Sequence, residues 1–106
     1  MGKHEPVTLL EPDARVPDGI VDAGTAPPAG RVADLAAAGE KVLVTLETDA
    51  REPDPGLLAA ASVYAWAGAR ALRVPASQAA AVRDVLDMVA SIRGERPPAE
   101  TRRGLA

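Results

Sequence analysis

The 106-residue chain contains no cysteine, no phenylalanine, and only one tryptophan, one tyrosine and one histidine. The lack of cysteine excludes disulfides, thiolate metal ligands and a cysteine nucleophile. The single histidine, His4, lies in a polar stretch near the start of the sequence. It is a poor candidate for acid–base catalysis or for a metal ligand. The sequence therefore predicts no metal site and no cofactor.

The chain also lacks long apolar runs and any basic stripe. Its 12 basic and 15 acidic residues give a net charge of −3, and no helical pattern gathers lysine or arginine along one side. This argues against nucleic acid as a partner. No window approaches the ~20 apolar residues that span a bilayer, and residues 1–6 lack the apolar core of a secretion signal. We expect a cytoplasmic protein that does not bind membranes.

What the sequence does contain is a repeated strand-then-helix pattern. Apolar strands are predicted at Ile20–Val21, Val42–Leu46 and Ala71–Val74, each followed by a helical pattern. The expected helices cover about residues 29–38, 56–67 and 77–93. Such alternation predicts parallel strands joined by right-handed crossovers. The expected fold is α/β, a small open sheet of three to four mostly parallel strands with about three helices. A closed (β/α)₈ barrel needs about 200 residues or more.

The remaining segments complete the expected domain organisation. Val7–Leu10 favours β structure and is interpreted as an edge strand or an extended leader. We therefore expect an N-terminal extended segment or edge strand at 1–17 and a βα-repeat domain at 18–94. Residues 95–106 are charged and rich in proline, and are expected to form a disordered or docking C-terminal tail.

Polar residues follow each predicted strand, at the edge of the sheet where α/β proteins bind ligands. Ser77 is expected to cap the last helix, whose free N–H groups favour an anion. Arg73 could supply a matching guanidinium, and Asp22 follows the first strand of the repeat. In the alternative interpretation, Arg73 pairs with Glu47 or Asp49 and Ser77 only caps the helix.

The helix predicted at 56–67 is apolar on nearly every side, which is typical of burial on more than one side. A chain of this size buries only about 60–65% of its unfolded surface. Its own core is therefore too small to cover every side of such a helix. We expect self-association or a partner to cover the remaining apolar helix faces and the edge of the sheet. The residues predicted to be buried by helix packing or a subunit contact are Leu57, Leu58, Trp66, Val85 and Val89.

From about Gly19 to Gly94, the sequence resembles the last three βα units of dihydropteroate synthase, a TIM barrel. Leu57–Val74 is similar to the penultimate helix and last strand of that family, and Val82–Ala90 to its final helix. The turn Asp22-Ala-Gly24 is similar to the family's Asp-Pro-Gly, and 42–46 to the strand before its Ser-Arg-Lys motif. The resemblance implies the arrangement of a partial TIM barrel.

The resemblance also implies roles for a few residues. In the family, the Asp of the first motif and the Lys of the second hold the pterin, and the Arg and His of an Arg-Val-His-Asp motif hold the anionic leaving group. Asp22 and Arg73 match these positions. Asp49 stands in place of the Lys and Pro75 in place of the His. The Lys-to-Asp change reverses the charge in the pterin pocket, and the first five βα units have no counterpart.

These departures lead us to expect a noncatalytic dihydropteroate synthase-related protein that acts through homo-oligomerisation or association with a partner. In the family, the last helices contribute to the dimer contact, so the matching helices here are candidates for it. One alternative is a small anionic ligand binder or enzyme that uses Asp22 and Arg73. Another is a regulatory subunit of a full-length synthase.

Overall fold

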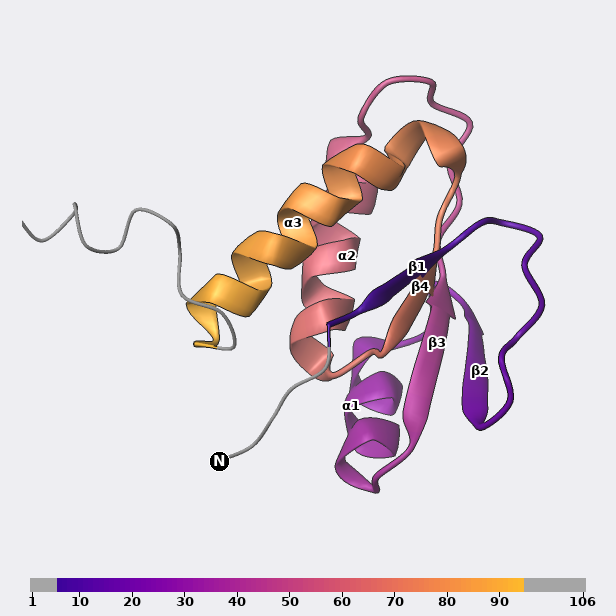
Figure 1. Ribbon diagram of the computed structural model, residues 1–106, viewed down its shortest axis with the longest axis vertical. Helices are drawn as coiled ribbons and strands as arrows, with labels where there is room; N and C mark the ends of the chain where they lie inside the picture. The colour runs from indigo at the N-terminus through magenta and orange to yellow at the C-terminus, as the bar shows by residue number, and fades with distance from the viewer. Residues whose placement is uncertain (1–5, 95–106) are drawn as a thin grey trace, which may run out of the picture.

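The computed structural model describes residues 6–94, which form a four-stranded parallel sheet with three α-helices (Figure 1). The open α/β fold predicted from the sequence is confirmed. His4 and the predicted tail at 95–106 lie outside the described residues. The elements in chain order are β1 (Thr8–Leu10), β2 (Ile20–Thr25), α1 (Ala29–Ala37), β3 (Lys41–Thr45), α2 (Pro55–Ala67), β4 (Ala71–Arg73), the short 3₁₀ helix η1 (Ala76–Gln78) and α3 (Ala79–Ile92).

The strands are arranged in the order β1-β4-β3-β2, so β1 and β2 form the two edges of the sheet. Val7–Leu10 thus contributes a true strand, in which Thr8 pairs with Ala71 of β4. At the other edge, β2 continues through residues that were expected to form a turn. Its register with β3 shifts between Asp22 and Thr25, where the chain leaves regular pairing.

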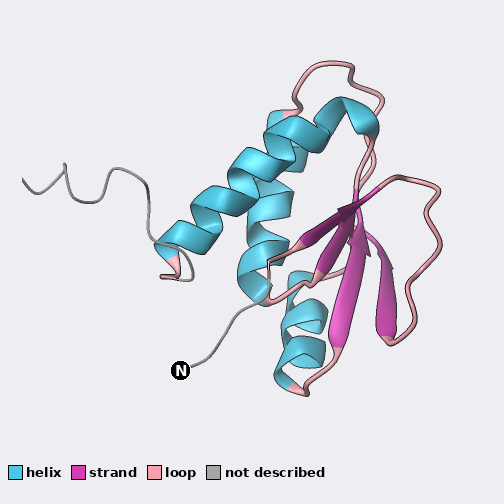
Figure 2. Cartoon of the chain, viewed as in Figure 1, coloured by secondary structure: helices cyan, strands magenta, loops and turns pink. Residues whose placement is uncertain are grey.

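All three helices lie on one face of the sheet, while the connection from β1 to β2 passes over the other (Figure 2). This follows from the strand order. From β2 to β3 to β4 the chain steps across the sheet in one direction, and right-handed crossovers place α1 and α2 on one face. From β1 to β2 the chain travels in the opposite direction, so a right-handed connection must use the opposite face. We call residues 11–19 the strap, and the two faces the helix side and the strap side.

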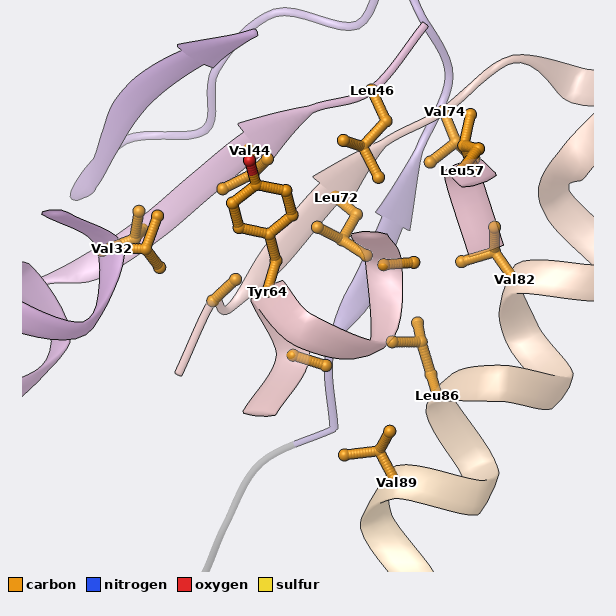
Figure 3. Close-up of a cluster of buried hydrophobic side chains, with 14 residues drawn as sticks. Val32, Val44, Leu46, Leu57, Tyr64, Leu72, Val74, Val82, Leu86 and Val89 are labelled. Atoms are coloured by element: carbon orange, nitrogen blue, oxygen red, sulfur yellow. The ribbon is translucent and has the colours of Figure 1, made fainter. Parts of the chain in front are cut away.

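The hydrophobic core fills the helix side, where side chains from the two central strands meet those of the helices (Figure 3). Val42, Val44 and Leu72 alternate toward the helices and are fully buried. The intervening residues point to the strap side. There Leu43 and Ala71, which pair with each other, are also buried. The central strands are therefore covered on both faces, as their apolar sequences predict.

Helix α2 is central to the core although its sequence shows no clear apolar stripe. It packs against both α1 and α3, and Leu57, Ala61, Tyr64 and Ala65 are its buried residues. The Tyr64 hydroxyl donates a hydrogen bond to the main-chain oxygen of Pro27, which ties α2 to the start of α1. None of the helices within residues 6–94 is long and apolar enough to cross a bilayer.

Both ends of α2 are defined by specific residues. At its start, the Asp54 carboxylate accepts hydrogen bonds from the main-chain N–H groups of Gly56 and Leu57, at 2.9 and 3.4 Å. At its end, Gly68 adopts a left-handed conformation with φ of 111°. A β-carbon on Gly68 would lie 2.7 Å from the β-carbon of Ala36, so α1 approaches the end of α2 too closely for any side chain.

We predict that Gly68→Ala destabilises the fold by about 2–4 kcal/mol, because it adds a left-handed backbone penalty to a steric clash. Urea unfolding followed by circular dichroism measures the change. The matched control is Gly30→Ala in α1, where an added β-carbon meets nothing within 4 Å. That variant should be neutral or up to about 1 kcal/mol more stable. Equal stability of the two variants would contradict the close approach of α1 and α2.

The cap at Asp54 predicts a pH dependence of stability. The hydrogen bond from Thr48, followed by the main-chain N–H of Leu57, lowers the pKa of Asp54 from its ordinary value of 3.8. A carboxylate with a lowered folded-state pKa stabilises the fold above its unfolded-state pKa, and this contribution is lost as the pH falls through the folded-state value. The loss should therefore begin near pH 3.8 and continue below it.

Asp54→Asn should keep much of the cap, since asparagine also caps helices, but it cannot titrate. The wild type should exceed this variant in stability near neutral pH, and the difference should shrink as the pH drops below about 4. Urea midpoints across this range measure it. The same substitution at Asp84, an exposed residue of α3, controls for loss of negative charge. A constant difference between wild type and Asp54→Asn would contradict the prediction.

Candidate functional site

The predicted ligand residues Asp22 and Arg73 lie together on the strap side of the sheet. Arg73 ends β4, and its Nη2 lies 3.3 Å from Asp22 Oδ2, forming a salt bridge across β3. The side chain of Arg73 is 16% exposed and that of Asp22 is 39% exposed. The structure thus brings together two residues that are 51 positions apart in sequence.

Each nitrogen of the Arg73 guanidinium donates a hydrogen bond within the chain. Besides the bond to Asp22, Nε donates to Thr45 Oγ1 at 3.1 Å, and Nη1 donates to the main-chain oxygen of Ala14 in the strap at 2.6 Å. Arg73 therefore connects β4 with β3, with β2 and with the strap. The alternative interpretation, in which Arg73 pairs with Glu47 or Asp49, is wrong about the partner, because the acid that contacts Arg73 is Asp22 of β2.

Asp22 is also held by its own turn. Its Oδ1 accepts a hydrogen bond of 2.8 Å from the main-chain N–H of Gly24, whose φ of 95° suits only glycine well. The next residues carry the chain back to β3, where the N–H of Ala26 donates to Thr45 at 2.9 Å. With Oδ1 bound to this turn and Oδ2 facing Arg73, both carboxylate oxygens of Asp22 have partners inside the chain.

Ser77 does not cap the last helix as predicted. It lies within η1, and α3 begins two residues later with Gln78 at the cap position and no side-chain cap. The Ser77 hydroxyl instead donates a 2.9 Å hydrogen bond to the main-chain oxygen of Ala50. The short 3₁₀ turn after Pro75 takes the place of the first helical turn, so Ser77 contacts the 47–54 loop rather than the N–H groups of α3.

The polar residue that organises this region is Gln78, which is fully buried. Its Oε1 accepts a 2.8 Å hydrogen bond from the N–H of Asp54, while its Nε2 donates to the main-chain oxygens of Ala50 and Glu52. A buried amide is costly unless its donors and acceptor have partners, and here both ends have them. Gln78 thereby fixes the loop at residues 47–54, beside the Asp54 cap.

No role for Gln78 was predicted from the sequence. The sequence around Gln78 gives only a weak indication of its buried position. A glutamine following Pro-Ala-Ser suggests a polar helix start, and only the folded loop reveals that three main-chain groups converge on it. Asp54 was more accessible to sequence reasoning, because an Asp immediately before Pro-Gly and an apolar run matches the pattern of a helix N-cap.

The predicted interface residues fall into three groups. Leu57 and Val89 are buried in the protein's own core, between the helices and the sheet. Leu58 and Val85 are partly buried at its margin. Trp66 is 54% exposed, its ring lies 5.1 Å from the Arg93 guanidinium, and its main-chain oxygen accepts a 2.8 Å hydrogen bond from Arg93. Among these residues, Trp66 presents most surface for contact with another molecule.

The arrangement offers little chemistry. Within the described part of the chain, no three side chains of His, Cys, Asp or Glu are placed to share a metal ion. Glu47 and Asp49 lie in the loop that follows β3, and Pro75 directly follows Val74 where the resemblance would place a histidine. The one arginine at the predicted ligand position is engaged on all three nitrogens by partners within the chain.

Comparison with known proteins identifies relatives of this chain. A protein named inactive dihydropteroate synthase 2 from Mycobacterium tuberculosis (strain H37Rv) is 48% identical over 85 residues, covering 71% of this chain and 26% of the relative. The protein of the same name from Mycobacterium leprae (strain TN) is 50% identical over 62 residues, covering 58% of this chain and 21% of the relative. No family model and no solved structure matches. The chain is therefore similar, over most of its length, to part of inactive dihydropteroate synthase 2, and it spans about a quarter of those curated relatives.

Proposed function

We propose that the protein is a noncatalytic relative of dihydropteroate synthase that acts by associating with another protein surface. One observation carries the noncatalytic half of this proposal. The two residues that match the family's ligand positions, Asp22 and Arg73, are paired with each other, and Arg73 also holds the strap. Groups used in this way support a structural role, since a ligand would have to compete with partners already in place.

The loop at residues 47–54 supports the same conclusion. Asp49 stands where the resemblance expects a lysine, so the charge that would face a pterin is reversed. The loop is also held from within by Gln78, and its Thr48 hydroxyl donates a 2.7 Å hydrogen bond to Asp54. The name of the relatives, inactive dihydropteroate synthase 2, is in keeping with loss of synthase chemistry.

The exposed apolar side chains of α2 and α3 support association. Val63 and Trp66 lie on α2, Met88 and Ile92 lie on α3, and each is more than half exposed. The two helices pack against each other, and Trp66 of α2 contacts Arg93 at the end of α3. Large exposed apolar residues gathered on neighbouring helices are typical of an interaction surface. The occupant that we propose is a second copy of the chain, which would make a homodimer.

A homodimer predicts two measurable properties of the protein, its molecular mass in solution and the emission of Trp66. At micromolar concentration, light scattering should give a dimer mass, and the emission of Trp66 should shift to the blue as concentration rises, because the ring leaves water. Met88→Lys should weaken association, because a charge at an apolar contact must be desolvated. Arg31→Ala, at an exposed position of α1, is the matched control and should leave the mass unchanged.

Two outcomes of that experiment count against the homodimer. A monomer mass across the concentration range, with constant Trp66 emission, would exclude the homodimer. A monomer that forms a mixed complex when a full-length dihydropteroate synthase is added would replace it with the regulatory subunit, the other associating partner considered from the sequence. In that case, Met88→Lys should weaken the mixed complex.

We further predict no turnover of a pterin diphosphate with p-aminobenzoate, since the charge at residue 49 is reversed and residue 75 is proline. A product assay at high protein concentration measures this, with an active synthase as the positive control. Turnover above background that is lost in Arg73→Ala would contradict the noncatalytic proposal. It would favour the enzyme or ligand binder that uses Asp22 and Arg73.

A further inference from the structure

The strap has little support from its surroundings. Of its nine residues, 11–19, only Ala14 and Val16 are partly buried, and the other seven are exposed. Its internal hydrogen bond is local, from the N–H of Ala14 to the oxygen of Glu11. Segments with few buried apolar contacts open at low free-energy cost compared with the core.

One polar contact ties the strap to the sheet. Arg73 Nη1 donates a 2.6 Å hydrogen bond to the main-chain oxygen of Ala14. Within residues 6–94, this is the only hydrogen bond that joins the strap to a strand or helix other than the two strands that it connects. Arg73 is itself fixed by Thr45 and Asp22 on the other two nitrogens. The guanidinium is thus pre-positioned toward the strap by two neighbouring strands.

The side of the sheet that the strap crosses carries buried apolar side chains. Leu43 and Ala71 point away from the helices and yet are almost completely buried, on the face that the strap crosses. Parallel sheets are normally covered on both faces, and none of the helices within residues 6–94 lies on the strap side (Figure 2). If the strap moved away, the centre of the sheet would be exposed to solvent.

We propose that the strap is a conformational latch, with Arg73 as its single polar fastening, and that its release uncovers the apolar strap side of the sheet while the helix side stays folded. The latch is independent of the helix surface used in the proposed function. The two can therefore fail separately.

Limited proteolysis tests the latch, because the exposed Arg15 provides a trypsin site in the middle of the strap. Cleavage after Arg15, followed by mass spectrometry, should be roughly tenfold faster or more in Arg73→Gln than in the wild type, since a hydrogen bond to a charged group is lost. Cleavage follows the open population when opening is fast. Cleavage after Arg31, in α1, is the internal reference and should not change.

The matched control is Arg83→Gln. Arg83 also donates from its guanidinium to a main-chain oxygen, that of Val7 at 3.4 Å, but it does not touch the strap. This variant should be cleaved after Arg15 at the wild-type rate. If Arg73→Gln does not fold, as judged by circular dichroism, Arg73→Lys is measured in its place, because lysine keeps the charge beside Asp22 but cannot serve three partners in the plane of a guanidinium.

The second measurement is binding of an apolar fluorescent dye, which should increase in the Arg73 variant and not in Arg83→Gln. Faster cleavage after Arg15 together with increased dye binding, at constant helix content, supports the latch. Unchanged cleavage would show that Arg73 does not fasten the strap. Faster cleavage without dye binding would show that the strap covers no apolar surface. Either result overturns the proposal.

Discussion

The arrangement of this protein depends on one topological constraint, the position of β1 beside β4 at the edge farthest from β2. Since strand β2 must then be reached across the whole sheet, and crossovers between parallel strands are right-handed, the connecting segment has to pass over the face without helices. The strap, the burial of Leu43 and the environment of Arg73 all follow from that placement.

The same constraint separates this molecule from a segment of a closed barrel. In a (β/α)₈ barrel, the face away from the helices is the barrel interior, which is filled by side chains of the strands themselves. Here the strap occupies that side, and Arg73 reaches it from β4. As long as the strap is in place, further strands cannot close around this face. Similarity in sequence to about a quarter of inactive dihydropteroate synthase 2 therefore coexists with an open sheet whose helix-free face is crossed by the chain's own strap.

Small side chains are the second condition for the fold. The chain has no phenylalanine, and α1 approaches the end of α2 so closely that Gly68 has no space for a β-carbon beside Ala36. A core of valine, leucine and alanine contributes less burial per residue than an aromatic core. Buried hydrogen bonds add to the packing at particular places, such as that of Tyr64 with Pro27 and those of Gln78 with the 47–54 loop.

The sequence predicted the elements of the repeat to within a few residues, because continuous apolar strands and amphipathic helices are recorded in local patterns. It also placed Asp22 and Arg73 at the same edge of the sheet. The partner of Arg73 was missed, since either Asp22 or the acids at residues 47 and 49 fitted the order of the strands. Ser77 was misplaced because a 3₁₀ turn and a helical turn have similar sequences. The strap was not foreseen, because its course depends on where β1 pairs.

The pairing of Thr8 with Ala71 has a consequence for the order of assembly. Strands β2, β3 and β4 form successive units with their helices, so each can dock on the one before it as the chain is synthesised. Of the four described strands, β1 is made before the others, but its neighbour in the sheet is β4, which is made last. Contacts between distant parts of a sequence form slowly because they close a long loop. We therefore expect β1, which is synthesised before the other three strands, to be the last of the four to join the sheet, so that the strap crosses the sheet late in folding.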